Sequence, residues 1–287
     1  MPAHSDPLFS SHPRDFQSNL YVYPVVSRRA EGISIGVNLN RNKFCNFRCI
    51  YCQVDQADPG EETLVDLQLL REELDWTVDW VVSGRIFQDT QFGGTPGPLR
   101  RLNDIAFSGD GEPTAFRNFA DAVSVCAEVR IRHRLDDVKL ILITNASLLH
   151  RWNVLPGLEI LDHNNGEIWA KLDAGTEDYF RQVARSAVSW RQILDNLKQA
   201  AQVRPIVIQS LFMRIHEQPP SANELDAYCR RLQEIVSSGG QIKLVQIHTV
   251  ARRPAEPFVF ALSNAEVDTI AEIVRRRTGL PVAGFYG

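Results

Sequence analysis

Hydrophobic positions fall into short β-branched runs that alternate with longer amphipathic stretches. Buried strands are predicted at residues 33–39, 104–108, 138–143, 167–172, 206–212 and 242–247, after a strand-like stretch at residues 21–26. Helical periodicity is predicted between and after them, at residues 64–82, 116–130, 189–203, 223–237 and 264–277. Ser221 and Asn264 are suited to begin helices, and Gly239 and Gly279 are suited to end them.

This alternation indicates βα units on a parallel sheet. Six units are too few for a closed eight-stranded barrel, so the predicted fold class is α/β, a partial (β/α)6 TIM-type barrel with parallel strands. A doubly wound open sheet is the competing architecture. Residues 1–20 are predicted to form a flexible N-terminal arm, and residues 21–287 a single partial-barrel domain. In either architecture the carboxyl ends of the strands carry the chemistry.

Composition narrows the class of protein. Hydrophobic residues make up 44% of the chain and charged residues 23%, which is typical of a soluble globular protein. The net charge of −4 provides no global attraction for nucleic acid. Residues 1–17 lack the apolar core of a signal peptide, and no run of about 18 apolar residues is present. With five cysteines, three of them clustered, a disulfide framework is not indicated, so we expect a cytoplasmic protein without a membrane partner.

Three cysteines lie in a C-x3-C-x2-C pattern, at Cys45, Cys49 and Cys52. Three thiolates at this spacing can hold a four-iron cluster and leave one iron open to a small molecule. A structural zinc site is the alternative, but it needs four protein ligands and no second pair of cysteines accompanies the triplet. Cys126 and Cys229 lie in predicted helices and are interpreted as core thiols.

Polar residues follow the other predicted strands. They are Gly109 to Thr114, then Thr144, Asn145 and Ser147, then Lys171 and Asp173, then Gln209 and Arg214, and finally Gln246 and His248. If the strands are parallel, these groups share one rim with the cysteine loop. Each also has a structural interpretation. The glycine segment can be an ordinary turn before a helix capped at Thr114, Ser147 can cap a helix, and Lys171 and Asp173 can pair with each other.

The cysteine loop resembles that of the radical S-adenosylmethionine (SAM) superfamily. Tyr51 occupies the aromatic position before the last cysteine, and Gly109-Asp110-Gly111-Glu112 resembles the family's Gly-Gly-Glu segment. The resemblance covers roughly residues 21–255. Within the superfamily the chain is most similar to the wyosine-tRNA-synthase-like group, on Ser27-Arg28-Arg29, residues 45–52, residues 107–114 and residues 171–175.

This resemblance implies a cofactor chemistry. Cys45, Cys49 and Cys52 would hold a [4Fe–4S] cluster, whose open iron would chelate the amino and carboxylate groups of SAM. Reductive cleavage would yield methionine and a 5′-deoxyadenosyl radical that abstracts hydrogen from the substrate. The residues expected to bind the cofactor are Tyr51, Gly109, Gly111, Glu112, Thr144, Asn145, Lys171, Asp173, Gln209 and His248. A flavodoxin or ferredoxin is the expected electron donor. The resemblance identifies no catalytic side chain beyond these groups.

The substrate is less defined. The wyosine-forming enzymes use a second cluster, with cysteines N-terminal to the radical SAM loop, whereas this chain has no cysteine before Cys45. A small anionic metabolite is therefore favoured over tRNA, with Arg28, Arg29, Arg252 and Arg253 as candidate ligands, because guanidinium groups suit phosphate and carboxylate. The same arginines can equally be solvated surface residues. Modification of an RNA base and non-catalytic binding through a zinc or cluster site are the alternative functions.

Overall fold

Parallel strands followed by helices make up both units into which the chain divides. The structure is a computed structural model that describes residues 16, 18–27, 29–40, 42–54 and 64–287. The first unit comprises Met1–Phe44, Pro59–Ile143 and His150–Glu167, and the second comprises Cys45–Asp58, Thr144–Leu149 and Ile168–Gly287. The prediction of one domain over residues 21–287 stays a prediction.

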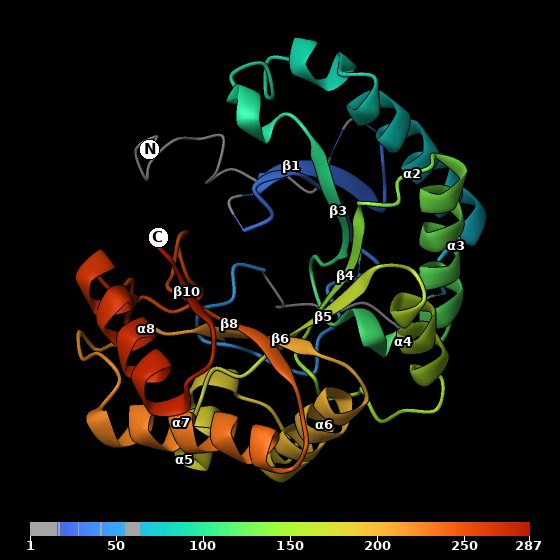
Figure 1. Cartoon of the computed structure of the whole chain (residues 1–287). Helices are drawn as coiled ribbons and strands as arrows, with labels where there is room; N and C mark the ends of the chain where they lie inside the picture. The colour runs from blue at the N-terminus through green and yellow to red at the C-terminus, as the bar shows by residue number, and fades with distance from the viewer. Residues whose placement is uncertain (1–15, 17, 28, 41, 55–63) are drawn as a thin grey trace. The chain divides into compact units, whose positions relative to one another are not determined.

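Four strands of the first unit follow one another in chain order: β1 (Val22–Ser27), β2 (Gly32–Val37), β3 (Leu102–Phe107) and β4 (Lys139–Thr144). β1 runs antiparallel to β2, whereas β2, β3 and β4 are parallel. Three helices accompany them, α2 (Leu67–Val82), α3 (Phe119–Arg132) and α4 (Leu155–Asp162), with α3 packed between the other two (Figure 1). Short 3-10 turns lie at η1 (Arg85–Gln88), η2 (Gly97–Leu99) and η3 (Pro113–Ala115).

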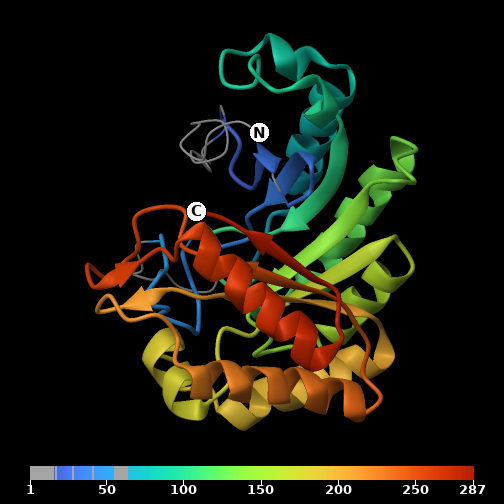
Figure 2. The ribbon, with the colours of Figure 1, turned by 60° about the vertical axis from the view of Figure 1, so that its left-hand side comes forward.

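The second unit continues the pattern with β5 (Gly166–Lys171), β6 (Ile206–Leu211), β8 (Ile242–His248) and β10 (Val282–Phe285), all parallel and again in chain order. Its helices are α5 (Glu177–Ala184), α6 (Trp190–Val203), α7 (Ala222–Ser237) and α8 (Asn264–Thr278). α7 packs against both α6 and α8, and α8 also contacts β8 and β10 (Figures 1 and 2). β7 (Arg214–Ile215) and β9 (Val259–Phe260) form a small antiparallel ribbon.

The strand order confirms the predicted fold class. All six predicted strands are present, as β2, β3, β4, β5, β6 and β8, and within each unit their order follows the sequence without reversal. A doubly wound sheet reverses its order at a switch point, so the topology is that of a partial TIM-type barrel. The strand-like stretch at residues 21–26 is also present, as the antiparallel β1.

Helix termini agree with the sequence at three of four positions. The Ser221 hydroxyl accepts from the Glu224 amide at 3.2 Å at the start of α7, and Gly239 and Gly279 adopt φ of 87° and 71° after α7 and α8. The prediction for Asn264 is wrong by one residue. Ser263 begins α8, because its hydroxyl and the Glu266 carboxylate form a reciprocal capping box that Asn264 cannot form.

A buried carboxylate fixes the start of β1. Glu73 of α2 accepts hydrogen bonds from the amides of Leu20, Tyr21 and Val22, at 2.6, 2.8 and 3.2 Å. Of the predicted flexible arm, residues 1–15 and 17 lie outside the described residues. Phe16, near its end, is only 6% exposed and packs 5.2 Å from the ring of Trp80. The part of the arm that is described is therefore anchored on α2.

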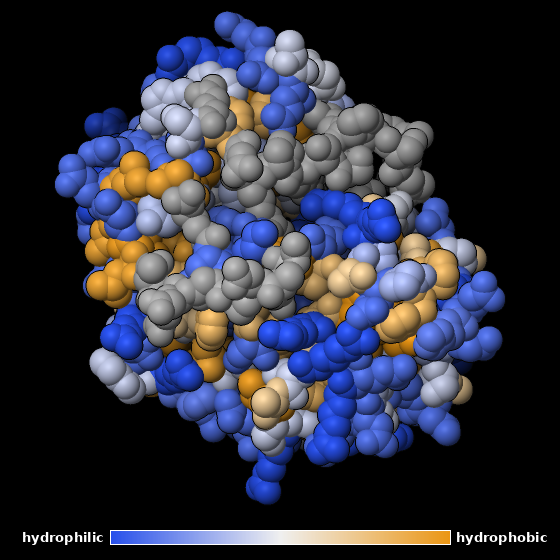
Figure 3. Space-filling model, turned by 180° about the vertical axis from the view of Figure 1, so that it is seen from behind, coloured by the Kyte–Doolittle hydropathy of each residue, from blue (hydrophilic) through white to orange (hydrophobic). Residues whose placement is uncertain are grey.

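The surface carries both hydrophilic and hydrophobic residues. On the face seen in Figure 3, hydrophilic residues predominate and hydrophobic residues form separate patches. Among the described residues, no helix combines the length and the apolar character needed to cross a bilayer.

Candidate iron–sulfur and cofactor site

The cysteine loop has no regular secondary structure and is anchored through its backbone. The amides of Arg48 and Ile50 donate to the carbonyls of Ala184 and Val183 at 2.9 Å each, so the loop is fixed to the end of α5. The amide of Cys52 closes a turn on the Cys49 carbonyl at 2.9 Å. These bonds place all three cysteines in the second unit, on a loop supported by a helix that the sequence did not predict.

Hydrophobic packing lies beneath the loop. Ile50 and Tyr51 are buried in a cluster with Val183, Met213, Ile215, Val250 and Val259, against which Cys49, Tyr179, Leu211 and Phe258 also pack. The β7–β9 ribbon contributes two of these residues, Ile215 and Val259. Burial of this side of the loop keeps water away from it, which suits a redox centre whose potential depends on solvent exposure.

The Cys45 sulfur has two polar contacts of the kind that stabilises a thiolate. The amide of Phe47 donates to Cys45 Sγ at 3.5 Å, and Asn145 Nδ2 lies 3.8 Å from the same sulfur. Burial raises the pKa of Cys49 to about 12, opposed by the positive charge of Lys171. A thiol binds iron as the thiolate, so the positive charge of a bound cluster would favour loss of the Cys49 proton.

The donor set also fits a cluster better than a single ion. Among the residues that the structure describes, no three His, Cys, Asp or Glu side chains are placed to hold one metal ion together. A cluster does not require that arrangement, because each thiolate binds a different iron. Three half-buried thiols on one anchored loop therefore match the ligand set of an iron–sulfur cluster.

Tyr51, Lys171 and Asp173 form one network beside the loop. The Tyr51 hydroxyl donates to Asp173 Oδ2, while Asp173 Oδ1 accepts from the Leu211 amide at 2.8 Å. Lys171 Nζ lies 3.5 Å from Asp173 Oδ2 and 4.7 Å from the centroid of the Tyr51 ring. Burial raises the pKa of Tyr51, so its hydroxyl remains a donor. Lys171 and Asp173 thus pair with each other, and the structure brings both to the last turn of the cysteine loop.

Asn145 organises the first turn of that loop. Its Nδ2 donates to Asn46 Oδ1 at 2.8 Å, and its Oδ1 accepts from the Ser147 amide and hydroxyl. The Ser147 hydroxyl in turn accepts from Asn46 Nδ2 at 2.8 Å. Thr144 Oγ1 accepts from the Ala146 amide at 3.0 Å. Ser147 lies in a turn and begins no α-helix, so its alternative role as a helix cap is wrong.

Gln209 and His248 meet through a third residue. Gln246 Oε1 accepts from Gln209 Nε2 at 2.8 Å and lies 3.3 Å from His248 Nε2. The His248 ring stacks on Phe285 with centroids 4.9 Å apart. Phe285 lies on β10, a four-residue strand that sequence periodicity did not reveal. Gln209 and His248, two of the predicted cofactor ligands, are therefore connected through Gln246.

In the first unit, the segment after β3 is shaped by its glycines. Gly109 has φ of 148°, and a Cβ there would lie 2.3 Å from Asn38 Oδ1. A Cβ on Gly111 would lie 2.0 Å from the Phe44 carbonyl oxygen. A side chain at Gly109 would displace Asn38 and would be strained at this positive φ, and one at Gly111 would displace the backbone that precedes the cysteine loop.

Two asparagines hold this turn. Asn38 accepts from the Asp110 amide at 3.1 Å and donates to its carboxylate at 2.6 Å. Asn40 Nδ2 donates to the carbonyls of Phe44 and Glu112, at 2.9 and 3.3 Å. The sequence reasoning missed both asparagines, although their position directly after β2, beside the cysteine loop, was an available signal.

Glu112 faces inward. Its carboxylate is buried and accepts from the Thr114 amide at 3.2 Å and hydroxyl at 2.5 Å, so Glu112 rather than Thr114 caps the short η3 turn. Of the four arginines predicted to bind substrate, Arg28 lies outside the described residues, Arg29 is in the first unit, and Arg252 and Arg253 are in the second.

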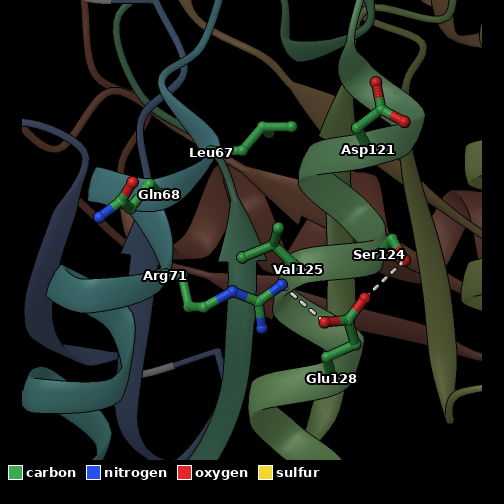
Figure 4. Close-up of a pocket in the computed structure, with 7 residues that line it drawn as sticks. All are labelled: Leu67, Gln68, Arg71, Asp121, Ser124, Val125 and Glu128. Carbon is green, nitrogen blue, oxygen red and sulfur yellow. Dashed lines mark hydrogen bonds and ion pairs between the residues drawn. The ribbon is translucent and has the colours of Figure 1, made fainter.

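A shallow hollow of about 430 Å³ lies between α2 and α3 in the first unit (Figure 4). In it, Arg71 pairs with Glu128 at 2.6 Å, and Ser124 donates to the same carboxylate at 3.2 Å, while Asp121 lies on the same wall of α3.

Comparison with known proteins resolves the family. The model of the Radical SAM superfamily matches residues 39–219, which include all three cysteines of the loop. The chain belongs to the radical SAM superfamily. This membership implies SAM and an iron–sulfur cluster as cofactors.

Curated relatives are distant and longer. The GTPase Obg of Brachyspira hyodysenteriae is 24% identical over 249 residues, covering 85% of this chain and 32% of that protein. UPF0026 protein MJ1312 of Methanocaldococcus jannaschii is 27% identical over 169 residues, covering 56% and 43%. The chain thus spans less than half the length of these relatives. Its sequence has no Gly-Lys pair, which a phosphate-binding P-loop requires.

Solved structures share the fold. A radical SAM methyltransferase from Sphaerobacter thermophilus superposes with a TM-score of 0.62 at 13% identity, covering 92% of this chain and 69% of the other. Archaeal TYW1 superposes with a TM-score of 0.50 at 13% identity, covering 87% and 73%. At these identities both likenesses concern the fold.

Proposed function

We propose that this radical SAM enzyme carries one [4Fe–4S] cluster on Cys45, Cys49 and Cys52 and uses it to start hydrogen abstraction from a small anionic substrate. When bound, the cluster would supply the electron that cleaves SAM to methionine and a 5′-deoxyadenosyl radical, which abstracts the hydrogen. The observation that carries the proposal is the anchored three-cysteine loop within the matched region.

The protein's own contribution is to hold and shield the loop. The α5 carbonyls bind its backbone, and the apolar cluster under Ile50 and Tyr51 excludes water from that side. Asn145 and the Phe47 amide donate toward Cys45, which stabilises negative charge on sulfur. These contacts keep the ligand set in place before any metal binds.

Cofactor binding is assigned to the polar strand ends. The backbone of the Gly109–Glu112 turn would offer hydrogen-bonding groups to the cofactor. Thr144, Asn145, Gln209 and His248 would offer short hydrogen-bonding groups. Lys171 and Asp173 together would present a fixed charge pair, and Tyr51 would orient Asp173 through its hydroxyl. These roles are proposals drawn from residue chemistry and position.

The substrate is proposed to be small and anionic. Arg252 follows β8 in the second unit and keeps its predicted role as a ligand for such a group. A tRNA substrate is disfavoured because the chain has no cysteine before Cys45 to hold the second cluster of the wyosine-forming enzymes.

The experiment is anaerobic reconstitution with iron and sulfide, followed by reduction with dithionite in the presence of SAM. We expect a brown protein with about four irons per chain that releases 5′-deoxyadenosine and methionine, measured by liquid chromatography and mass spectrometry. A colourless protein with about one bound zinc would support the non-catalytic alternative. A loaded cluster that yields no 5′-deoxyadenosine, beside an active radical SAM enzyme as control, would contradict the proposal.

A further inference from the structure

A solvent-open hollow reaches two of the cluster cysteines. It has a volume of about 510 Å³ and is lined by Cys49 and Cys52 together with Arg48, Gln53, Arg185, Arg253 and Glu256 among others. Both cysteines are half-buried, whereas Arg48, Gln53, Arg185 and Arg253 are exposed. The hollow lies wholly within the second unit. A molecule seated there would touch the ligands of the proposed cluster directly.

The hollow is positively charged on a chain that is negative as a whole. Among the described residues that line it, three are arginines and one is an acid, Glu256, whose carboxylate pairs with Arg185. The whole chain carries −4. Local charge opposite to the net charge selects an oppositely charged partner and steers its approach.

The backbone holds these arginines in a defined arrangement. Arg48 lies in the cysteine loop, Arg185 ends α5 in the left-handed conformation with φ of 46°, and Arg253 follows β8. The Ile50 amide binds the Val183 carbonyl at 2.9 Å, and the Ile50 carbonyl accepts from the Glu256 amide at 3.2 Å. One residue of the cysteine loop thus joins the two segments that carry Arg185 and Arg253.

The lining differs from the groups assigned to SAM. Tyr51, Lys171 and Asp173 form their own network at the end of β5, and none of them lines the hollow. The hollow therefore reaches Cys49 and Cys52 from a side that this network does not line, although Cys49 also interacts with Tyr51 and Lys171. A reductant needs such a side, because it must approach the cluster while SAM is bound.

We propose that this hollow is the docking surface for an acidic one-electron carrier protein of the flavodoxin or ferredoxin type. One electron passes from the reduced carrier to the oxidised cluster, so the carrier is oxidised and the cluster reduced by one electron, and no bond is made or broken. Electron transfer weakens steeply with distance, so contact at the cluster ligands favours it. In this proposal Arg253 contacts the carrier protein, while Arg252 keeps its predicted role as a substrate ligand.

This inference rests on the proposed cluster, and its test separates the two. In the reconstituted full chain, cluster reduction is followed by absorbance and electron paramagnetic resonance with two reductants: a reduced acidic flavodoxin, and photoreduced deazaflavin, a small neutral molecule. The test variants are Arg48→Glu and Arg253→Glu, alone and combined. Arg191→Glu is the matched control, because Arg191 lies on α6 of the same unit with its side chain 90% exposed and does not line the hollow.

We expect the double variant to slow reduction by flavodoxin at least about tenfold and to leave reduction by deazaflavin unchanged. The wild-type rate with flavodoxin should fall as salt rises from about 0.05 M to about 0.5 M, and the double variant should lose this dependence. Arg191→Glu should behave as wild type.

An unchanged flavodoxin rate in the double variant, with deazaflavin still reducing its cluster, overturns the docking surface and leaves the proposed function standing. If that variant also loses binding of inorganic phosphate in calorimetry, the hollow is an anion site for substrate instead. A wild-type chain that forms no cluster overturns both proposals.

Discussion

The Tyr51 hydroxyl is hydrogen-bonded to Asp173, which joins the last turn of the cysteine loop to the end of β5. Asp173 also binds the Leu211 amide and pairs with Lys171, so one carboxylate connects the loop with β5 and β6. The aromatic position of the C-x-aromatic-C motif therefore acts through its hydroxyl as well as its ring. A phenylalanine there would keep the ring and lose the connection.

Tyr51→Phe should lower the free energy of unfolding of the metal-free protein by about 1–3 kcal/mol. The reason is that the half-buried Asp173 carboxylate loses one of its hydrogen-bond donors. Urea unfolding followed by circular dichroism measures the change. Equal midpoints for variant and wild type would show that the hydrogen bond contributes nothing.

Tyr179→Phe also removes a tyrosine hydroxyl, but here we expect no loss of stability. The Tyr179 hydroxyl is buried and has no hydrogen-bond partner among the described residues. Removing an unsatisfied polar group from an apolar setting should leave stability unchanged or raise it by up to about 1 kcal/mol. A loss as large as that of Tyr51→Phe would mean that the hydroxyl has a partner such as a water molecule.

Replacing any of Cys45, Cys49 or Cys52 by Ala should reduce the iron content of the reconstituted protein from about four to near zero. Cys126→Ala is the matched control, because Cys126 is fully buried in α3 of the other unit. Iron and sulfide analysis with the visible spectrum gives the answer. Full cluster loading in all three variants would show that these cysteines are not the cluster ligands.

Gly111→Ala should destabilise the protein by about 1–3 kcal/mol, because its Cβ would lie 2.0 Å from the Phe44 carbonyl oxygen. The clash involves backbone just before Cys45, so cluster loading should fall as well. Gly94→Ala is the control, since no atom lies within 4 Å of a Cβ at that position. Indistinguishable unfolding curves for the two variants would contradict the prediction.

Asp104 should make stability depend on pH. Burial raises its pKa from 3.8 to about 6, opposed by the hydrogen bond from Ser34 and the charges of Arg29 and Lys139. Between these values the unfolded chain has released the proton that the folded chain retains, so stability falls as pH rises. Relative to Asp104→Asn, the wild type should lose about 2.5 kcal/mol between about pH 4 and about pH 7.

Urea unfolding of both proteins across that range tests the prediction. Asn keeps an oxygen that can accept from Ser34 but does not titrate. A difference in unfolding free energy that is the same at both ends of the range would show that Asp104 keeps its ordinary pKa in the folded state.

Periodicity was sufficient for the long elements. The strands of the barrel and the helices α2, α3, α6, α7 and α8 were predicted because each is long enough to show a repeating pattern of buried residues. α4 and α5 span eight residues each and β10 four, so their patterns are too short to detect. For α5 a signal was present, since Thr176 caps the helix by accepting from the Tyr179 amide and two acidic residues follow.

Candidate ligands were recognised where chemistry is local. The three cysteines, Tyr51 and the two glycines lie close together in sequence or at a strand end, so spacing alone indicated them. Arg48 and Arg185 were not assigned to the cysteine site, because they are separated by more than a hundred residues and meet only through the bonds between Ile50 and α5.

The sequence by itself determined the superfamily, the order of the βα units and the cysteines proposed as ligands, because motif spacing and hydrophobic period are properties of neighbouring residues. Only the tertiary structure decided which groups share an environment. It placed Tyr51 on Asp173, gathered Arg48, Arg185 and Arg253 beside Cys49 and Cys52, and buried Asp104. Contacts between residues far apart in the chain depend on how strands and helices pack, and local pattern does not encode that packing.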